Sequence, residues 1–406
     1  MKLTQTSYDE HMPVRGRVAR VAAVLAAGAA LAGCGGSKPA QPQLVLERAG
    51  APGAPGIHHY EYVFPDRELD VYDLDRGFRL VERRRIPEAH ALRGVAVSPR
   101  TRRLYFSVGG NGGTSGTGSL VAYDLVRNRV LWLRHFRTGT DSLAVTPDGK
   151  TLFVPEGERS FGDVWYVLDA ATGRIQREIH AGPGPHNTIV GPDGRFVYLG
   201  PRNSRWLYVA STRTGRIVRR VGPLSPGVRP FTIDGTERYA FTTATGRLGF
   251  QVASLRTGRV LYTVRPSGFR GGRSLGTPSH GISISPDSRE VDVLDVPNAY
   301  VHAYDVSALP ARAPRLIANI PLHPGLKGRE QPCGGDCGRA GWLQTSLDGR
   351  WLFVGDDGDV IDLRTHRVRA LLPALRNSRY LFELDWRGRI PIRTSTRSGI
   401  GYPPPS

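Results

Sequence analysis

The stretch PGPHNTIVGPDGRFVYLG, residues 183–200, carries the pattern on which most of the chain is built. A short apolar segment precedes the tripeptide Pro192-Asp193-Gly194, and a second apolar segment follows it. Proline presets φ and glycine supplies the positive φ that many tight turns require. The stretch therefore predicts two antiparallel strands joined by a turn, with His186 just before the first strand.

Related copies of this strand–turn–strand pattern recur along the chain. They read GVAVSPRTRRLYFSV (94–108), SLAVTPDGKTLFVP (142–155), ISISPDSREVDVLD (282–295) and LQTSLDGRWLFVG (343–355), with weaker copies at 231–243 and 381–394. A second hairpin follows most copies, as in YVLDAATGRIQREI at 166–179. Alternating apolar and polar residues are typical of half-buried strands. Each unit thus predicts a four-stranded antiparallel meander.

Seven such units can be counted from an Asp-like position near the end of each third strand. These positions are Asp73, Asp124, Asp169, Ser211, Ser254, Asp305 and Asp362. Their spacing, roughly 42 to 57 residues, is close to the length of a propeller blade. The first unit shows only outer strands (71–84) and the last only inner strands (381–394), so both ends of the chain would complete one blade. We expect an all-β, seven-bladed β-propeller over residues 58–400, in which ring closure removes exposed sheet edges.

The repeats resemble the YVTN-type (YncE-like) β-propeller family. The family's strand motif reads roughly Pro-His-Gly-Ile-x-x-Ser-Pro-Asp-Gly, and this chain has PSHGISISPD at 278–287 and PHNTIVGPDG at 185–194. The resemblance covers about four fifths of the chain and implies a propeller of the kind found in bacterial surface and periplasmic proteins. It leaves the function open, because the family resembles sensors, scaffolds and some lactone hydrolases alike.

The N-terminal segment predicts where the protein is located in the cell. In MPVRGRVARVAAVLAAGAALAGC (12–34) three arginines precede a run of small apolar residues that ends in Leu-Ala-Gly-Cys. This ending resembles the lipobox of bacterial lipoproteins, in which the cysteine is acylated. The alternative is a transmembrane anchor, but the apolar run is too short to span a bilayer comfortably. We expect a signal peptide over 1–33, a lipid on Cys34 and a Gly/Pro/Ala-rich flexible tether over 34–57.

Met12 suits the start of this signal better than Met1, because Asp9 and Glu10 fit poorly in a basic leading segment. The lipid would hold the protein on the outer face of the bacterial cytoplasmic membrane or cell envelope. That compartment is oxidising, so Cys333 and Cys337 predict a small disulfide, with a two-thiolate metal site as the alternative.

The formal net charge of +19 raises the question of nucleic acid. Most of the positive charge is arginine scattered through turns, and aromatic residues are not interleaved for base stacking. This distribution argues against nucleic-acid binding and favours contact with anionic lipid headgroups. We expect a monomer.

The candidate site follows from the repeat. Six residues before each turn proline stand Arg93, Asp141, His186 and His280. The weaker copies offer Arg229, Gly341 with Trp342 beside it, and Tyr380. Because inner strands line the channel of a propeller and start at one end of it, these side chains would meet at a channel mouth. The alternative is that they only satisfy channel water and backbone groups.

The predicted ligand-binding residues are Arg93, Asp141, His186, Arg229, His280 and Trp342. Arginine recognises carboxylate or phosphate with two parallel hydrogen bonds, and histidine binds metals or moves protons. We therefore expect a binding or scaffold module for a protein, a glycan or a small anionic ligand. The alternative is a metal-assisted, lactonase-like hydrolase with a metal on His186, His280 and Asp141.

The sequence predicts no catalytic residue and leaves the identity of any cofactor open. It holds neither Gly-x-Ser-x-Gly nor His-Glu-x-x-His, which argues against a covalent hydrolase of a standard type. His58 and His59 are adjacent, and adjacent residues of a strand point to opposite sides. They precede the first predicted strand, so we expect them to lie across one face and at most one of them to reach a channel mouth.

Overall fold

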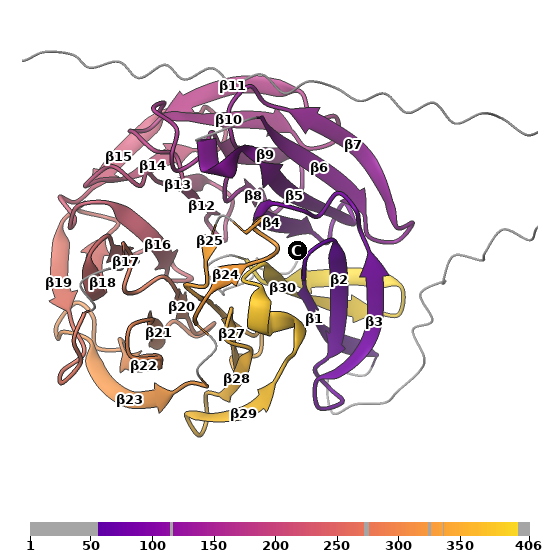
Figure 1. Cartoon of the computed structure of the whole chain (residues 1–406). Coiled ribbons are helices and arrows are strands. Elements are labelled where there is room, and N and C mark those ends of the chain that lie inside the picture. The colour runs from indigo at the N-terminus through magenta and orange to yellow at the C-terminus, as the bar shows by residue number, and fades with distance from the viewer. Residues whose placement is uncertain (1–55, 114–116, 272–275, 324–325, 336, 397–406) are drawn as a thin grey trace, which may run out of the picture. The chain divides into compact units, whose positions relative to one another are not determined.

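The computed structural model describes residues 56–396 apart from 114–116, 272–275, 324–325 and 336 (Figure 1). The predicted signal peptide, Cys34 and nearly all of the tether lie outside these residues. Within them, no helix is both long enough and apolar enough to cross a membrane.

Seven antiparallel sheets surround a channel as blades, which confirms the all-β, seven-bladed propeller (Figure 1). Two short 3-10 turns, η1 (Gly110–Gly113) and η2 (Ala374–Asn377), are the helical elements of the described residues. Six blades have four strands each, which are, from the innermost strand outward: β4 (Leu92–Ser98), β5 (Arg103–Gly109), β6 (Gly118–Asp124), β7 (Arg129–His135); β8 (Ala144–Val145), β9 (Thr151–Pro155), β10 (Val164–Asp169), β11 (Ile175–His180); β12 (Asn187–Val190), β13 (Phe196–Gly200), β14 (Leu207–Ser211), β15 (Ile217–Val221); β16 (Val228–Ile233), β17 (Tyr239–Ala244), β18 (Arg247–Ser254), β19 (Val260–Val264); β20 (Ile282–Ile284), β21 (Glu290–Asp295), β22 (Tyr300–Asp305), β23 (Arg315–Pro321); and β26 (Trp342–Thr345), β27 (Trp351–Gly355), β28 (Asp359–Asp362), β29 (Arg367–Leu371).

Both ends of the propeller sequence build the seventh, closing blade. Its strand order is β3-β2-β1-β30-β31. The N-terminal side supplies β1 (Ile57–Val63), β2 (Glu68–Asp73) and β3 (Arg79–Arg85), and the C-terminal side supplies β30 (Leu381–Arg387) and β31 (Ile390–Thr394). Closure by the two ends is confirmed, and β31 adds a fifth strand on the channel side of β30.

The N-terminal strands of this blade correct the expectation that His58 and His59 lie across one face of the propeller. Residues 57–63 do not lie across a face; they form β1, which pairs with β30 along its whole length. The physical reason is the alternation of Tyr60 and Tyr62, which pack into one cluster with Phe382 and Leu384 of β30. The N-terminal side therefore contributes three strands rather than only the outer pair at 71–84.

Turn chemistry explains why the weaker repeats keep the same architecture. Between the first and second strands, Gly194 and Gly349 adopt φ of 73° and 74°. The corresponding turns without this glycine hold Glu237 and Ser288 at φ of 54° and 60°. A non-glycine residue incurs a steric penalty there. The hairpins thus form the same turn whether or not the sequence reads Pro-Asp-Gly.

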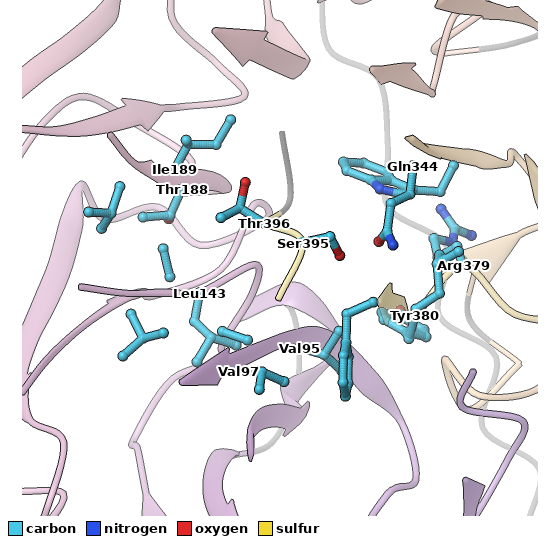
Figure 2. Close-up of a pocket in the computed structure, with 17 residues that line it drawn as sticks. Val95, Val97, Leu143, Thr188, Ile189, Gln344, Arg379, Tyr380, Ser395 and Thr396 are labelled. Atoms are coloured by element: carbon cyan, nitrogen blue, oxygen red, sulfur yellow. The ribbon is translucent and has the colours of Figure 1, made fainter. Parts of the chain in front are cut away.

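The channel itself is narrow. Its lining includes Val97 of β4, Leu143 just before β8, and Ile189 of β12 (Figure 2). Ser395 and Thr396, just after β31, reach into the channel. The cavity among these side chains offers about 40 Å³ to the centres of water-sized molecules. That volume suits roughly three or four waters. A ligand larger than a few water molecules must therefore bind at an end of the channel.

A disulfide-linked hairpin follows blade five. It comprises β24 (Arg329–Glu330) and β25 (Cys337–Gly338), and lies near the centre of the ring in Figure 1. Cys333 and Cys337 form the predicted disulfide, with their Cα atoms 5.8 Å apart. The amide of Leu92, at the start of β4, donates a hydrogen bond to Pro332 O at 2.6 Å. The hairpin therefore reaches across to the first blade and covers part of the mouth at which the inner strands begin.

Candidate functional site

The candidate site lies at the channel end where the inner strands begin, which we call the inner-strand mouth. Loops that join the second and third strands of each blade end at the same side, because successive strands of a meander run in opposite directions. Arg93, Asp141, His186, Arg229 and Trp342 are all buried there, with 4–7% of each residue exposed. His280 is half-buried.

Asp141 and His186 come together on blades two and three. Asp141 Oδ2 lies 3.1 Å from His186 Nδ1, and the amide of Ser142 donates to Asp141 Oδ1 at 2.9 Å. Asp141 Oδ2 also accepts the amide of Glu158, at 3.2 Å, which fixes the loop that carries this glutamate. Both ring nitrogens of His186 are buried and neither makes a hydrogen bond of good geometry. The ring is therefore held by charge and packing and keeps its hydrogen-bonding capacity unused.

Glu158 is the centre of this half of the mouth. Its Oε2 atom lies 2.9 Å from Arg229 Nη1, 3.0 Å from Arg202 Nη1 and 3.8 Å from His186 Nε2. Burial raises the pKa of the carboxyl group, but the charges of His186, Arg229 and Arg202 outweigh this effect. The pKa of Glu158 consequently lies well below its ordinary value. The glutamate is an anion held by three basic side chains.

Arg379 is the centre of the other half, next to the disulfide hairpin. Its Nε donates to Glu330 Oε2 at 2.6 Å and lies 3.5 Å from Asp356 Oδ2. Asp356 Oδ2 in turn accepts the amides of Ala340 and Gly341 at 3.1 and 3.0 Å. Glu330 and Asp356 are fully buried. This cluster attaches the hairpin and the start of β26 to the closing blade.

His280 lies between the two halves. Its Nδ1 is 3.0 Å from Gly341 O and 3.4 Å from Arg379 Nη1. One ring nitrogen cannot donate to a carbonyl and accept from a guanidinium at once, so the shorter contact assigns the proton to Nδ1. Burial, followed by the positive charge of Arg379, lowers the pKa of His280 well below 6.5. The imidazole is therefore neutral at pH 7.

At the other predicted positions, the side chains contact groups of the protein itself. Arg93 Nη1 donates to Cys337 Sγ at 3.3 Å, under the hairpin. The Trp342 ring lies edge-on to His280, with ring centroids 6.2 Å apart. Tyr380 donates its hydroxyl proton to Leu92 O at 2.6 Å and so bridges the closing blade and blade one. The predicted ring thus divides into a Glu158 half, containing Asp141, His186 and Arg229, and an Arg379 half.

The predicted metal ligands do not form one group. Over the described part of the chain, two sets of His, Cys, Asp and Glu have ligand atoms all within 4.8 Å of one another: Glu330 with Cys333 and Cys337, and His59 with Glu383 and Asp385. Neither set contains Asp141, His186 or His280. In the first set both sulfurs are in the disulfide, so no thiolate is available to a metal.

Sequence reasoning missed Glu158, Arg202, Arg379 and Glu330. Arg202 and Glu158 lie in loops between second and third strands, so the meander topology alone could have placed both loops at this mouth. Arg379 is one residue before Tyr380, the position that the repeat register selected. Glu330 belongs to the hairpin, which has no counterpart in the repeat and therefore no register.

Comparison with known proteins supports the fold alone. No protein-family model and no curated protein sequence matches this chain. Among solved structures, it resembles a chain of hydrazine synthase from Kuenenia stuttgartiensis, with a TM-score of 0.51 and 16% sequence identity. The match covers 74% of this chain and 96% of that one. At this identity the similarity concerns the arrangement of blades and says nothing of ligand or activity.

Proposed function

We propose that this protein is a lipid-anchored, extracytoplasmic binding module that takes a small anionic ligand at the inner-strand mouth. A β-propeller scaffold is consistent with a binding module. The ligand class follows from the Glu158 half of the mouth, and the anchoring follows from the N-terminal sequence.

The single observation that carries the proposal is the environment of Glu158. A carboxylate reaches in from a loop and meets two guanidinium groups and an imidazole, at 2.9, 3.0 and 3.8 Å. These are the side chains and distances by which proteins recognise a bound carboxylate or phosphate. Glu158 therefore fills, from within the chain, a site whose chemistry suits an anionic ligand.

The backbone of the loop that carries Glu158, residues 156–163, is held by hydrogen bonds, and the glutamate side chain is the group that an external anion would replace. Phe161 on the same loop is fully exposed. The Arg202 side chain is 29% exposed, so one of the two guanidinium groups faces solvent at the edge of the site. An external anion can approach along Arg202 and take the place of the Glu158 carboxylate.

The anchoring rests on the predicted signal peptide and on Cys34. The excess of arginine over the whole chain would reinforce the attachment by attracting anionic headgroups, an effect that salt weakens. The hydrolase alternative gains no support from the geometry, because His280 donates to Gly341 O and stands beside Arg379.

The test is a thermal-shift series on the purified full chain with acetate, succinate, phosphate and sulfate. We expect at least one of these anions to raise the Tm of the wild type and to lose this effect in Arg229→Gln. Glu178→Gln, on the exposed face of β11, is the matched control and should respond like the wild type. If all four anions act equally on the wild type and on Arg229→Gln, the proposed site is wrong.

A further inference from the structure

A second cluster of ionisable residues lies on the closing blade, away from the inner-strand mouth. In the β1–β30 pair, His59 is opposite Asp385 and Glu61 is opposite Glu383. Opposite residues of an antiparallel pair share a face, and so do residues two apart along a strand. The four side chains therefore lie on one face of the sheet. Tyr60, Tyr62 and Leu384 occupy the other face and pack into the apolar core.

Three carboxylates in this cluster are removed from water. Glu61, Glu383 and Asp385 are each at most 1% exposed. A buried carboxylate is costly unless a positive charge or several hydrogen bonds compensate it. Around these three groups, such compensation has to come from the neighbouring strands and turns.

The contacts fall short of what three carboxylates need. Glu61 accepts from Gln344 Nε2 at 3.2 Å, and Glu383 Oε2 accepts the amide of Leu347 at 2.6 Å. Asp385 Oδ1 is 2.8 Å from His59 Nδ1. Asp385 Oδ2 is buried without a hydrogen bond, and Arg393 Nε lies 3.9 Å from it on a side chain that is 39% exposed.

We propose that His59, Glu383 and Asp385 form a binding site for one divalent transition-metal cation. His59 Nδ1 is 2.8 Å from Asp385 Oδ1 and 3.8 Å from Glu383 Oε1, and all three ligand atoms lie within 4.8 Å of one another. Ligands held at about 2.0–2.2 Å from one ion are about 3.0–3.5 Å apart. Small side-chain movements thus bring the three atoms to metal-binding distances.

The donor set selects the class of metal. One imidazole nitrogen with carboxylate oxygens suits Zn²⁺ or Mn²⁺, whereas Mg²⁺ and Ca²⁺ prefer oxygen ligands alone. The His59 side chain is 26% exposed, so it stands at the solvent edge and leaves a path for the ion. Glu61, paired with Gln344, lies on the same face behind the ligands.

The position of the site gives it a structural role. His59 comes from the N-terminal side of the closing blade, and Glu383 and Asp385 come from the C-terminal side. A cation bound to all three would join the two ends of the propeller across the seam at which the ring closes. Because the folded state alone assembles the ligands, binding should stabilise it.

The test is calorimetric titration of the chelator-treated full chain with Zn²⁺ and with Mn²⁺. We expect about one cation per chain, a higher Tm in its presence, and affinity at least about tenfold lower in both Asp385→Asn and Glu383→Gln. Glu383→Gln keeps an acceptor for the Leu347 amide, and removing a buried ionisable group should leave each variant folded without metal.

The matched control is Asp163→Asn. Asp163 faces His180 at the same 2.8 Å distance, but both side chains are exposed, and so is Glu178, the other carboxylate in an ion pair with His180. This variant should bind the cation as the wild type does. The proposal is overturned if the wild type binds neither cation, or if Asp385→Asn and Glu383→Gln bind as tightly as Asp163→Asn. Anion binding at the inner-strand mouth is independent of either result.

Discussion

Individual residues at the inner-strand mouth owe their charge to their neighbours. Glu158 is buried and yet strongly acidic, because the charges of His186, Arg229 and Arg202 lower the pKa of its carboxyl group. His280 is neutral, because burial and Arg379 both lower the pKa of its imidazole. At pH 7 the mouth thus holds one buried carboxylate that stays charged and one imidazole that stays uncharged.

The depressed pKa of His280 predicts a loss of stability in acid. Below pH 6.5 the unfolded chain binds a proton at His280, whereas the folded chain does not. The free energy of unfolding therefore rises with pH up to about 6.5, and the contribution of His280 is constant above that pH. The slope is at most about 1.4 kcal/mol per pH unit. Urea unfolding at about pH 5.5 and pH 7.5, on either side of the ordinary histidine pKa, should show this slope in the wild type and in the control His135→Gln on the exposed edge of β7, and a smaller slope in His280→Gln. An unchanged slope in His280→Gln would refute the assignment.

The repeat register found the residues of the site that the inner strands carry. Asp141, His186 and Arg229 were predicted because each precedes or begins an inner strand, and these three meet around Glu158. Glu158 itself could not be predicted from the repeat. Its position depends on a loop conformation that Asp141 fixes through a backbone amide, which is a tertiary contact that periodicity does not encode.

At the scale of elements, the disulfide hairpin and the Glu158 loop are additions to a regular set of blades. The hairpin is attached at several points: to Leu92, to Arg93 and to Arg379. The Cys spacing predicted the bond, but nothing in the spacing indicated that the hairpin would cross to the first blade. The closing blade was likewise predicted in kind, while β1 was missed because Tyr60 and Tyr62 lie outside the repeat motif.

Removing the disulfide should loosen the hairpin and leave the blades intact. The bond closes a loop of only about five residues, so Cys333→Ser with Cys337→Ser should cost about 2 kcal/mol at most. Hydrogen exchange should speed up in residues 329–338 and at the Leu92 amide, which donates to Pro332. Exchange in β12 and β13 serves as the internal control. Equal acceleration there, or none in the hairpin, would contradict this picture.

At the scale of the molecule, seven blades close through strands from both ends of the propeller sequence. The blade count was predictable because each unit repeats the same hairpins, and the turns keep their geometry even where Glu237 or Ser288 replaces glycine. The composition of the closing blade depends on pairing between strands at opposite ends of the propeller sequence, such as Tyr60 with Leu384. Local patterns do not specify a partner at that distance.

The predicted lipid on Cys34 should determine whether the whole protein associates with the membrane. Cys34→Ser should move the protein from the membrane fraction to the soluble fraction, because the lipid is the expected anchor and surface charge alone binds weakly at physiological salt. Fractionation at low and high salt separates the two contributions. A Cys34→Ser protein that stays with membranes at high salt would rule out the lipoprotein assignment.

If Glu158 occupies the proposed anion site, isothermal titration of Glu158→Gln tests this most directly. The substitution keeps the shape of the side chain but leaves Arg202 and Arg229 without their carboxylate, while His186 keeps Asp141. Using the anion that shifts the wild-type Tm most, we expect Glu158→Gln to bind at least about tenfold more tightly than the wild type, with Glu178→Gln unchanged. Equal or weaker binding by a folded Glu158→Gln protein would contradict the claim.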